Sequence, residues 1–413
     1  MSITALPVSP TCRGSDPMDA IKPSDAAALV ETVAWAVATK TPLELIGRGT
    51  KRALGRPVQS ARLLDVGGFS GILSYEPAEL VLTAAAGTPL AEIEIALSEA
   101  RQHFAFEPPD YGKLLGGEPG GQSIGGVVAS NLAGPRRLTA GAVRDHLLGF
   151  AAVSGRGEAF KSGGKVVKNV TGYDLSKLIC GSWGTLAVMT EVTLKVLPRP
   201  EATVTVLLRG LPAAEAVAAM SRALGGPHDV AAAAWLPATL LGAAGLAGFG
   251  SATALRLEGP APSVAFRADA LATLFGAAER IESEASATLW RAIRDAEPFA
   301  AEQSRQIWKI SVPPMAGAAI VAAYPKDDAF LDWGGGLVWL ALPPSAEAGA
   351  EKLRALVAAH GGHATLVRAD AATRAALPVF EPRPGPLGEL GRRVKQAFDP
   401  EGILNPGRMQ AGI

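Results

Sequence analysis

The sequence predicts an α+β protein, and three observations along its 413 residues support this fold class. A glycine-rich stretch runs from Gly112 to Ser130, with seven glycines between Gly112 and Gly126. Short segments typical of strands lie on both sides of this stretch. From residue 201 the chain becomes Ala-rich, in a pattern that predicts helices alternating with antiparallel strands. A chain of this length predicts two or three domains with ample core.

The glycine-rich stretch predicts a place where the backbone lies against a flat or anionic group. Glycine loses more backbone entropy on folding than other residues, so such a density suits sharp turns and close approach. Exposed backbone N–H groups without neighbouring side chains are what an anionic or planar cofactor requires. An ordinary glycine-rich surface loop is the alternative, but it explains Ile124 less well, because this apolar residue lies inside the loop as if packed.

Composition excludes several classes of protein. A hydrophobic content of 48% and a charged content of 19% are typical of a soluble globular protein. Lys and Arg together number 39, as do Asp and Glu, so no net charge favours nucleic acid. Two cysteines, Cys12 and Cys180, are too few for a disulfide framework or a thiolate-ligated cluster, and the cytoplasm is the expected compartment. Residues 1–19 lack the apolar segment of a signal peptide and predict a loose tail.

One uncharged segment is long enough to cross a bilayer. Residues 230–255 contain no charged side chain over 26 positions. The segment is mostly Ala and Gly and is interrupted by Pro237, so its hydrophobicity per residue is modest. We therefore expect buried strand and helix inside a domain, and no transmembrane segment.

The N-terminal elements lead into a turn suited to phosphate. Ser24 and Asp25 predict the N-cap of a helix that reaches Lys40 with one apolar face. Leu43 to Ile46 then predicts a short strand, which runs directly into Gly47–Gly55. The Gly-x-Gly-Thr-Lys start of this loop supplies permissive backbone, a hydroxyl and cations, as phosphate binding requires.

Two better-known nucleotide motifs are absent. Gly47-x-Gly49 lacks the third glycine of G-x-G-x-x-G, because position 52 is Arg52, and a strand is expected next. Gly163-Gly164-Lys165 has no glycine five residues before Gly164, so it is no P-loop. These departures argue against a dinucleotide-binding Rossmann domain and a P-loop NTPase.

The remaining elements before residue 200 are predicted from apolar periodicity and from the positions of proline. Thr88-Pro89 predicts a helix with proline at its first position, carrying an apolar repeat through Leu97. Residues 182–196 begin as a tight turn and end as an alternating strand, after which Pro198 closes the domain. Further strands are expected at 61–66, 80–84 and 150–153.

The order of five segments resembles the FAD-binding domain of the vanillyl-alcohol-oxidase and p-cresol-methylhydroxylase (PCMH) type of flavoprotein. These segments are Gly47–Gly55, Ser123–Asn131, Gly141–Gly149, Lys168–Leu175 and Ser182–Glu191. Lys168 and Asn169 fit a solvated turn as well as a cofactor contact. Within this superfamily the chain looks like the FAD-binding E subunit of bacterial glycolate oxidase. That resemblance rests on the segments Ser130–Arg137, Leu331–Gly335 and Phe398–Arg408.

The resemblance implies a fold with four parts. After the tail at 1–19, residues 20–200 would form a PCMH-type FAD-binding domain of two α/β subdomains. Residues 201–375 would form an α+β cap over the isoalloxazine, with an antiparallel sheet and helices on one side. Residues 376–413 would return to the FAD domain.

The resemblance also implies which residues bind the cofactor. Gly47, Arg48, Gly49, Thr50 and Lys51 would hold the pyrophosphate. Ser123, Ile124, Gly125, Gly126, Ala129 and Asn131 would lie along the pyrophosphate and flavin. Gly184, Thr185, Val188 and Glu191 would meet or support the adenine side, where Trp183 and Ala187 depart from the smaller residues common in the family. Asn405 would approach the ring from the C-terminal segment.

The mode of FAD attachment follows from an absent residue type. Several members of the superfamily attach flavin covalently through a histidine in the segment equivalent to Gly47–Gly55. No histidine occurs there in this sequence, so non-covalent FAD is expected.

The cap region predicts a lid whose chemistry the sequence does not identify. Residues 211–224 predict an amphipathic helix, and 306–312 and 337–342 predict strands. Trp308 and Trp339 on those strands are most simply core residues, with a substrate wall as the alternative. Oxidation of a 2-hydroxy acid requires a cation for the carboxylate and a base for the hydroxyl proton. Arg256, Arg305 and Lys309 are candidate cations, and the sequence selects none of them.

The sequence gives little support for a catalytic histidine or for a metal site. Catalytic D-subunit relatives carry a Gly-Glu-His-Gly motif in the cap, and none of the five histidines here lies in such a motif. His360 and His363 have metal-ligand spacing, but the two glycines between them indicate a turn, so no metal site is expected. The catalytic residues therefore stay unknown from sequence.

Three functions remain open. The resemblance implies an FAD-binding subunit of a glycolate oxidase (glycolate dehydrogenase) that acts with a catalytic flavin subunit and an iron–sulfur subunit. Such a subunit would relay electrons or support the assembly, in the cytoplasm or peripherally at the inner membrane through its partners. A self-sufficient FAD-dependent 2-hydroxy-acid or alcohol dehydrogenase is one alternative. A non-catalytic scaffold with a vestigial flavin site is the other.

Overall fold

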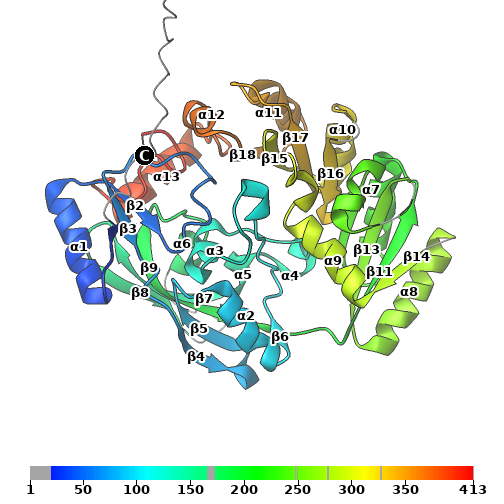
Figure 1. Ribbon diagram of the computed structural model, residues 1–413, viewed down its shortest axis with the longest axis horizontal. Coiled ribbons are helices and arrows are strands. Elements are labelled where there is room, and N and C mark those ends of the chain that lie inside the picture. The colour runs from blue at the N-terminus through cyan, green and yellow to red at the C-terminus, as the bar shows by residue number, and fades with distance from the viewer. Residues whose placement is uncertain are drawn as a thin grey trace, which may run out of the picture.

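The computed structural model describes residues 20–164, 173–246, 248, 250–276, 279–325 and 328–412. Two α+β halves lie side by side, with the first half, residues 20–200, on the left of Figure 1 and the cap on the right. The last helix of the chain, coloured red, lies beside the first strands, coloured blue. This arrangement confirms the predicted fold class of a sheet-rich α+β protein.

The first subdomain is a small parallel sheet in the order β1-β3-β2. Its elements are β1 Ala20–Ile21, α1 Ala26–Thr39, β2 Leu43–Ile46 and β3 Arg62–Asp65. The predicted cap of α1 is confirmed, because the Asp25 side chain accepts a hydrogen bond from the N–H of Ala28 at 2.9 Å. Leu29, Val33 and Ala36 of α1 are buried against this sheet. The sheet thus fixes the carboxyl end of β2, from which the Gly47–Gly55 loop begins.

The second subdomain is a five-stranded antiparallel sheet in the order β4-β5-β9-β7-β8. Its strands are β4 Ile72–Glu76, β5 Val81–Ala85, β7 Leu147–Ser154, β8 Ala159–Gly163 and β9 Ala187–Lys195. Its helices are α2 Leu90–Glu99, α3 Ile124–Ser130, α4 Arg137–Ala140, α5 Val143–His146 and α6 Leu175–Ile179. Pro89 occupies the N-cap of α2, one position before the predicted one. A short antiparallel pair of strands, β6 Gln102–His103 and β10 Leu197–Pro198, joins the segment after α2 to the end of this half.

The cap is an eight-stranded antiparallel sheet in the order β14-β11-β13-β12-β16-β17-β15-β18. Its strands are β11 Ala202–Arg209, β12 Val230–Leu236, β13 Ala252–Gly259, β14 Glu279–Glu282, β15 Gln306–Ser311, β16 Ala329–Asp332, β17 Leu337–Leu342 and β18 His363–Arg368. Its helices are α7 Ala213–Leu224, α8 Ala261–Phe275, α9 Ser283–Arg294, α10 Gly317–Ala322 and α11 Ala350–Ala359. The predicted helix at 211–224 and strands at 306–312 and 337–342 are therefore confirmed to within two residues.

The two faces of the cap sheet are covered differently. Apolar residues of α7, α8, α10 and α11 pack on one face, together with the fully buried Trp308. On the other face α9 packs with Trp339, Tyr111 and Leu114, of which the last two belong to the first half of the chain. The expectation of helices on one side only is thus wrong, because α9 covers part of the face that meets the first half of the chain.

The uncharged segment 230–255 lies inside the cap. Its two ends form β12 and the first part of β13, which pair in antiparallel register, and two short 3-10 turns, Ala238–Leu240 and Gly242–Ala244, lie between them. No helix in the described part of the chain is long and apolar enough to span a membrane.

The end of the chain returns to the first subdomain. After α12 Ala371–Ala376 and α13 Pro386–Phe398, Leu404 forms a parallel bridge with Leu43 of β2. The N–H of Leu43 donates to Ile403, and the N–H of Asn405 donates to Leu43. Lys395 is buried where it donates to the carboxylate of Asp399 at 2.6 Å and to the carbonyl of Leu404 at 3.0 Å. These contacts hold the C-terminal segment against β2.

Candidate functional site

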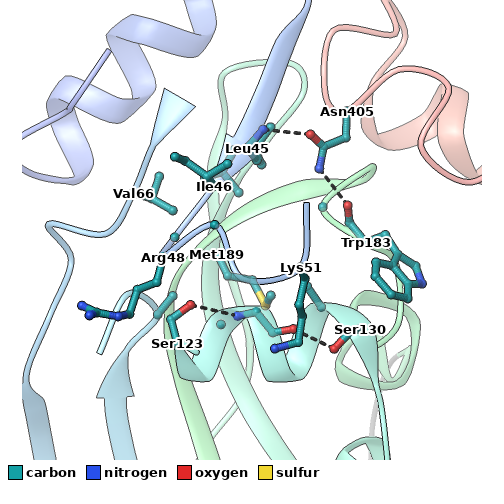
Figure 2. Close-up of a pocket in the computed structure, with 18 of the residues that line it drawn as sticks. Leu45, Ile46, Arg48, Lys51, Val66, Ser123, Ser130, Trp183, Met189 and Asn405 are labelled. Carbon is teal, nitrogen blue, oxygen red and sulfur yellow. Dashed lines mark hydrogen bonds between the residues drawn. The ribbon is translucent and has the colours of Figure 1, made fainter. Parts of the chain in front are cut away.

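A pocket lies between the two subdomains of the first half, at the point where β2, α3 and β9 meet the C-terminal segment (Figure 2). Twelve of the sixteen residues predicted from the sequence to bind cofactor line it. They are Gly47, Arg48, Gly49, Thr50, Lys51, Ser123, Gly125, Gly126, Ala129, Gly184, Val188 and Asn405. Segments more than 350 residues apart in the chain thus converge on one cavity.

The Gly47–Lys51 turn presents bare backbone to this pocket. Gly49 has a φ of +73°, in the left-handed region that favours glycine. Within the described ranges, no hydrogen-bond partner is found for the N–H groups of residues 48–51. Consecutive free N–H groups in a turn form a concavity that binds anions.

Helix α3 lies close to the same turn because its N-cap is a serine and its second and third residues are glycines. A Cβ added at Gly47 would lie 2.6 Å from Oγ of Ser123, and one added at Gly125 would lie 2.7 Å from the carbonyl oxygen of Ala86. The N–H of Gly125 donates to that carbonyl at 2.7 Å, and Oγ of Ser123 accepts from Gly126 at 3.4 Å. The first N–H groups of α3 are thus used within the protein, and the free donors belong to the Gly47–Lys51 turn.

Cations surround the turn at different depths. Figure 2 shows Lys51 lying over α3 while Arg48 points away from it. Burial lowers the pKa of Lys51 to about 8, an effect that Asp110 partly offsets, and its ammonium donates to Oε1 of Gln122 at 2.7 Å. Behind the turn, Arg408 donates to the carbonyls of Lys51 at 2.5 Å and Arg52 at 3.3 Å. These carbonyl contacts hold the turn with its N–H groups toward the pocket.

Asn405 connects three segments at the pocket. Its Oδ1 accepts from the N–H of Leu45 at 2.8 Å, and its Nδ2 donates to the carbonyl of Trp183 at 2.8 Å. A Cβ at Gly184, whose φ is +69°, would lie 2.8 Å from that Nδ2. Asn405 therefore lines the pocket, while both polar atoms of its side chain hold β2 and the turn before β9 in place.

These features together fit FAD. Free N–H groups and nearby cations suit a pyrophosphate, and the uncharged surfaces of Ala129, Val188 and Met189 suit a planar ring. The glycines at 47, 125 and 184 leave no space for a side chain between the converging segments. The residues present could thus hold an extended dinucleotide along the pocket.

Four predicted cofactor residues lie outside the lining of the pocket. Ile124 is fully buried in the core of the second subdomain. Asn131 is the C-cap of α3, and its Oδ1 accepts from the N–H of Arg144 at 3.0 Å. Oγ1 of Thr185 donates to the carbonyl of Ser182 at 2.7 Å. Glu191 is exposed on β9. Residues 168–172 of the Lys168–Leu175 segment lie outside the described residues.

Sequence reasoning missed several apolar lining residues. They include Leu45, Ile46, Val66, Ala86 and Met189. A register shift in the pairing of β7 with β9 lies between the pairs Ala151–Glu191 and Ala152–Met189. Such an irregularity interrupts strict alternation along a strand. Alternation read from the sequence alone cannot locate it.

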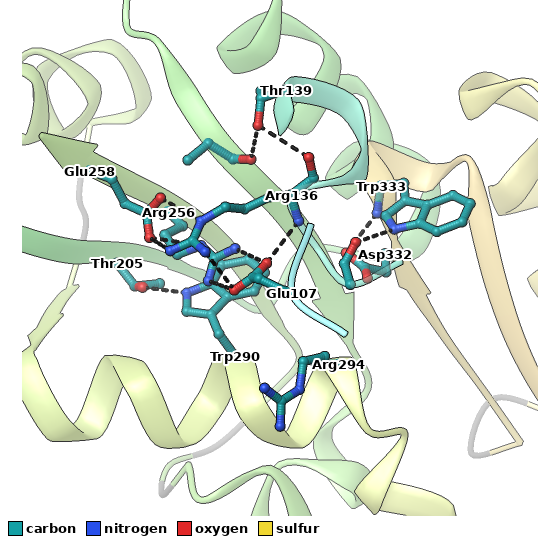
Figure 3. Close-up of polar contacts among 12 residues, drawn as sticks. Glu107, Arg136, Thr139, Thr205, Arg256, Glu258, Trp290, Arg294, Asp332 and Trp333 are labelled. Atoms are coloured by element: carbon teal, nitrogen blue, oxygen red, sulfur yellow. Dashed lines mark hydrogen bonds and ion pairs between the residues drawn. The ribbon is translucent and has the colours of Figure 1, made fainter. Parts of the chain in front are cut away.

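A buried group of charges joins the cap to the first half (Figure 3). Arg256 of β13 donates to both oxygens of Glu107 at 2.8 and 2.7 Å. Arg136 donates to both oxygens of Glu258 at 2.7 and 2.6 Å, and its own N–H donates to Glu107 at 3.0 Å. Burial alone would raise the pKa of Glu107, but the two guanidinium groups lower it to about 2. We call these four residues the interdomain charge cluster.

The histidines take no visible part in the pocket. Among the described residues none of the five lines it. Burial lowers the pKa of His103 to about 4, and Nε2 of the buried His146 lies 2.8 Å from the carbonyl oxygen of Ala140. The described residues include no group of three or more His, Cys, Asp or Glu side chains arranged to hold a metal ion.

Comparisons with known proteins agree with this geometry. A family model described as an FAD binding domain matches residues 18–163. The chain is 38% identical over 387 residues to glycolate oxidase subunit GlcE of Escherichia coli K12, covering 94% of this chain and 97% of that protein. It is 30% identical over 202 residues to glycolate oxidase subunit GlcD of Bacillus subtilis, covering 49% of this chain and 40% of that protein.

Two solved structures show the same fold at low sequence identity. The structure of p-cresol methylhydroxylase with substrate bound matches with a TM-score of 0.67 and 14% identity, covering 95% of this chain and 88% of that chain. A structure of alkyldihydroxyacetonephosphate synthase matches with a TM-score of 0.64 and 15% identity, covering 94% of this chain and 76% of that chain. The predictions of a PCMH-type fold and of FAD are confirmed, whereas the individual contacts to FAD stay predictions.

Proposed function

Because this chain belongs to the family of the glycolate oxidase subunit GlcE, we propose that it is the FAD-binding subunit of a complex that oxidises glycolate to glyoxylate. The pocket between the two subdomains is the observation that carries this proposal. It brings twelve of the predicted cofactor residues together around a turn whose backbone N–H groups are free within the described chain. Bound FAD would supply the acceptor for two electrons taken from a 2-hydroxy acid.

Each part of the pocket has a task in this proposal. The Gly47–Lys51 turn binds the pyrophosphate, supported from behind by Arg408. The small residues of α3 allow the cofactor to approach the helix closely. Asn405 keeps the third segment, which contains Trp183 and Gly184, against β2. FAD is held without a covalent bond, since the Gly47–Gly55 loop contains no histidine.

Partners are part of the same proposal. The complex would contain a catalytic flavin subunit and an iron–sulfur subunit, with this chain relaying electrons or supporting the assembly. It would work in the cytoplasm, with any attachment to the inner membrane made through those partners. A self-sufficient 2-hydroxy-acid dehydrogenase is the second candidate, and the cap surface described in the next subsection favours it.

An anaerobic reduction experiment separates these functions. The purified chain is loaded with FAD, mixed with glycolate in the absence of oxygen and followed by the loss of visible flavin absorbance. The same measurement is then made after co-expression with the two partner subunits. Reduction only with the partners supports the leading proposal, and reduction of the isolated chain supports the self-sufficient enzyme. Failure to bind FAD would contradict both proposals and would support a non-catalytic scaffold with a vestigial flavin site.

A further inference from the structure

The structure distinguishes the three cap cations that the sequence left equivalent. Arg256 is bound by both oxygens of Glu107 within the interdomain charge cluster. Arg305 forms an ion pair with Asp328 and also donates to the carbonyl of Ala341. Lys309 has neither a hydrogen bond nor an ion pair within the described part of the chain. Of the three cations, only Lys309 is available to a ligand.

Lys309 lies on the face of the cap sheet that meets the flavin-binding half. Its neighbours on β15, Trp308 and Ile310, pack on the opposite, helix-covered face, and strand alternation directs Lys309 away from them. Its ammonium lies 5.1 Å from the ring centre of Trp333 and 5.7 Å from that of Trp339. These two rings stabilise the cation without neutralising its charge.

A hydroxyl lies on the same face beside this ammonium. Thr365 of β18 is directly opposite Lys309 in the antiparallel ladder, so the two side chains share one face of the sheet. Both residues are partly exposed, and no hydrogen bond of the Thr365 hydroxyl is found among the described residues. An ammonium and a hydroxyl side by side form a donor pair suited to a carboxylate.

Trp333 connects this surface to residues next to the flavin pocket. Nε1 of Trp333 donates to the carbonyl of Gly134 at 3.0 Å, and Gly134 follows α3 by four residues. Trp183 lines the pocket and packs against the same apolar cluster as Trp333. The Leu331–Gly335 segment therefore fixes the cap beside the end of the pocket formed by Trp183 and the last residues of α3.

Asp332, whose charge acts on Lys309, does not form an ion pair with it among the described residues. This carboxyl group is buried and accepts from the N–H of Trp333 at 2.7 Å. The ammonium of Lys309 thus lies over two aromatic rings without a bonded anion among the described contacts, and a carboxylate ligand would supply one. One ammonium and one hydroxyl can pair with the two oxygens of a single carboxylate group, so a small carboxylic acid complements this surface.

We propose that Lys309, together with the hydroxyl of Thr365 and the ring of Trp333, binds the carboxylate of a small 2-hydroxy acid on this chain. This inference rests on the proposed function, since it gives the flavin subunit a substrate subsite of its own. Lys309 is a binding residue in this account, and the base for the hydroxyl proton is not assigned.

The test measures binding separately from oxidation. Oxalate carries the carboxylate but no hydrogen at the adjoining carbon, so it binds without being oxidised. The FAD-loaded chain is titrated with oxalate, and binding is followed by calorimetry and by the change in the visible flavin spectrum. Saturable binding is expected for the natural chain, as is a Kd about tenfold or more higher for Lys309→Met, the loss of one charge-assisted hydrogen bond.

Matched variants make the result specific. Lys309→Arg keeps the cation and should retain oxalate binding, whereas Thr365→Val should weaken it less than Lys309→Met does. Lys352→Met on the exposed surface of α11 removes an equal charge and should leave binding unchanged. All variants should contain as much FAD as the natural chain. Equal oxalate affinity in Lys309→Met, or no binding by the fully FAD-loaded natural chain, would overturn this inference and leave the FAD-binding function intact.

Discussion

The flavin pocket and the cap surface beside it are built in opposite ways. In the pocket, glycine, alanine and serine bring backbone from three segments close together, and a turn presents its free N–H groups. On the cap surface, large side chains dominate, with Lys309 over two tryptophan rings and the buried interdomain charge cluster nearby. The pocket is suited to a large cofactor held along its backbone, and the cap surface to a small ligand held by a few side chains.

This difference explains how each region relates to stability. A substitution in the pocket adds atoms where the backbone leaves no space, so it acts first on the cofactor. A substitution in the charge cluster removes a partner from a buried ion and acts on the whole fold. The predictions below test this division, beginning with the largest effect.

Glu107→Gln should produce the largest loss of stability. It removes a buried carboxylate that pairs with Arg256 and Arg136 across the boundary between the halves, and breaking such a pair costs about 3–5 kcal/mol. Denaturant unfolding measures this loss. Asp269→Asn is the matched control, since it breaks a solvent-exposed pair with Arg280 and should cost about 1 kcal/mol or less.

The pH dependence of Glu107 has a definite sign. The folded-state pKa of about 2 lies below the ordinary value of 4.5, so its contribution is present above pH 4.5 and is lost as the pH falls toward 2. The difference in unfolding free energy between the natural chain and Glu107→Gln should therefore shrink below pH 4.5. A difference that grows with acid would contradict the assignment.

Gly47→Ala should weaken FAD binding more than it weakens the fold. The added Cβ would lie 2.6 Å from Oγ of Ser123, and overpacking of this kind costs about 1–3 kcal/mol. The Kd for FAD, from fluorescence titration of the apoprotein, should rise by roughly tenfold to a hundredfold.

A double variant and a distant glycine sharpen this measurement. Ser123→Gly removes the obstructing hydroxyl at a small cost to the α3 cap, so Gly47→Ala combined with Ser123→Gly should recover most of the affinity. A Cβ at Gly164 meets nothing within 4 Å among the described residues, so Gly164→Ala should bind FAD as the natural chain does. Equal affinity in Gly47→Ala alone would show that the close approach of these segments is unimportant.

Asp332→Asn should have the smallest effect, and it should depend on pH. Burial raises the pKa of Asp332 to about 7 from an ordinary 3.8, so its contribution to stability is largest below pH 3.8 and is lost as the pH rises through 7. Asparagine keeps an acceptor for the N–H of Trp333 and carries no charge. The stability of the variant relative to the natural chain should therefore be higher at pH 8 than at pH 5. Thermal unfolding at pH 5 and pH 8 tests this, and a relative stability that is lower at pH 8 than at pH 5 would indicate that Lys309 and Arg256 favour the ionised carboxylate more strongly than burial disfavours it.

The sequence predicted the pocket well because its signals are local. The strand at Leu43–Ile46 and the glycines after it lie within a few residues of each other, so spacing and residue type suffice. The same holds for Ser123 to Ala129. Glu191 was expected from its position in a motif to meet or support the adenine side, and in the structure its side chain is exposed on β9 next to a register shift in the pairing with β7.

The cap chemistry could not be predicted because it depends on contacts between distant segments. Glu107 and Arg256 are 149 residues apart, and only their pairing removes Arg256 from the candidate cations. Lys309 differs from the other two cations because it lies over the ring of Trp333. This residue is in the connection between β16 and β17, and its indole N–H donates to the carbonyl of Gly134. No periodicity in the sequence brings these residues together.

The most direct test of the account is the flavin content of the purified chain before and after acid precipitation. A pocket that holds FAD along three segments without a covalent bond predicts a yellow protein with one FAD per chain. Acid should release the flavin completely into the supernatant, and the apoprotein should take up FAD again. A correctly folded protein that is colourless and binds no FAD added in excess would contradict the central claim, and flavin that stays with the precipitate would contradict non-covalent attachment.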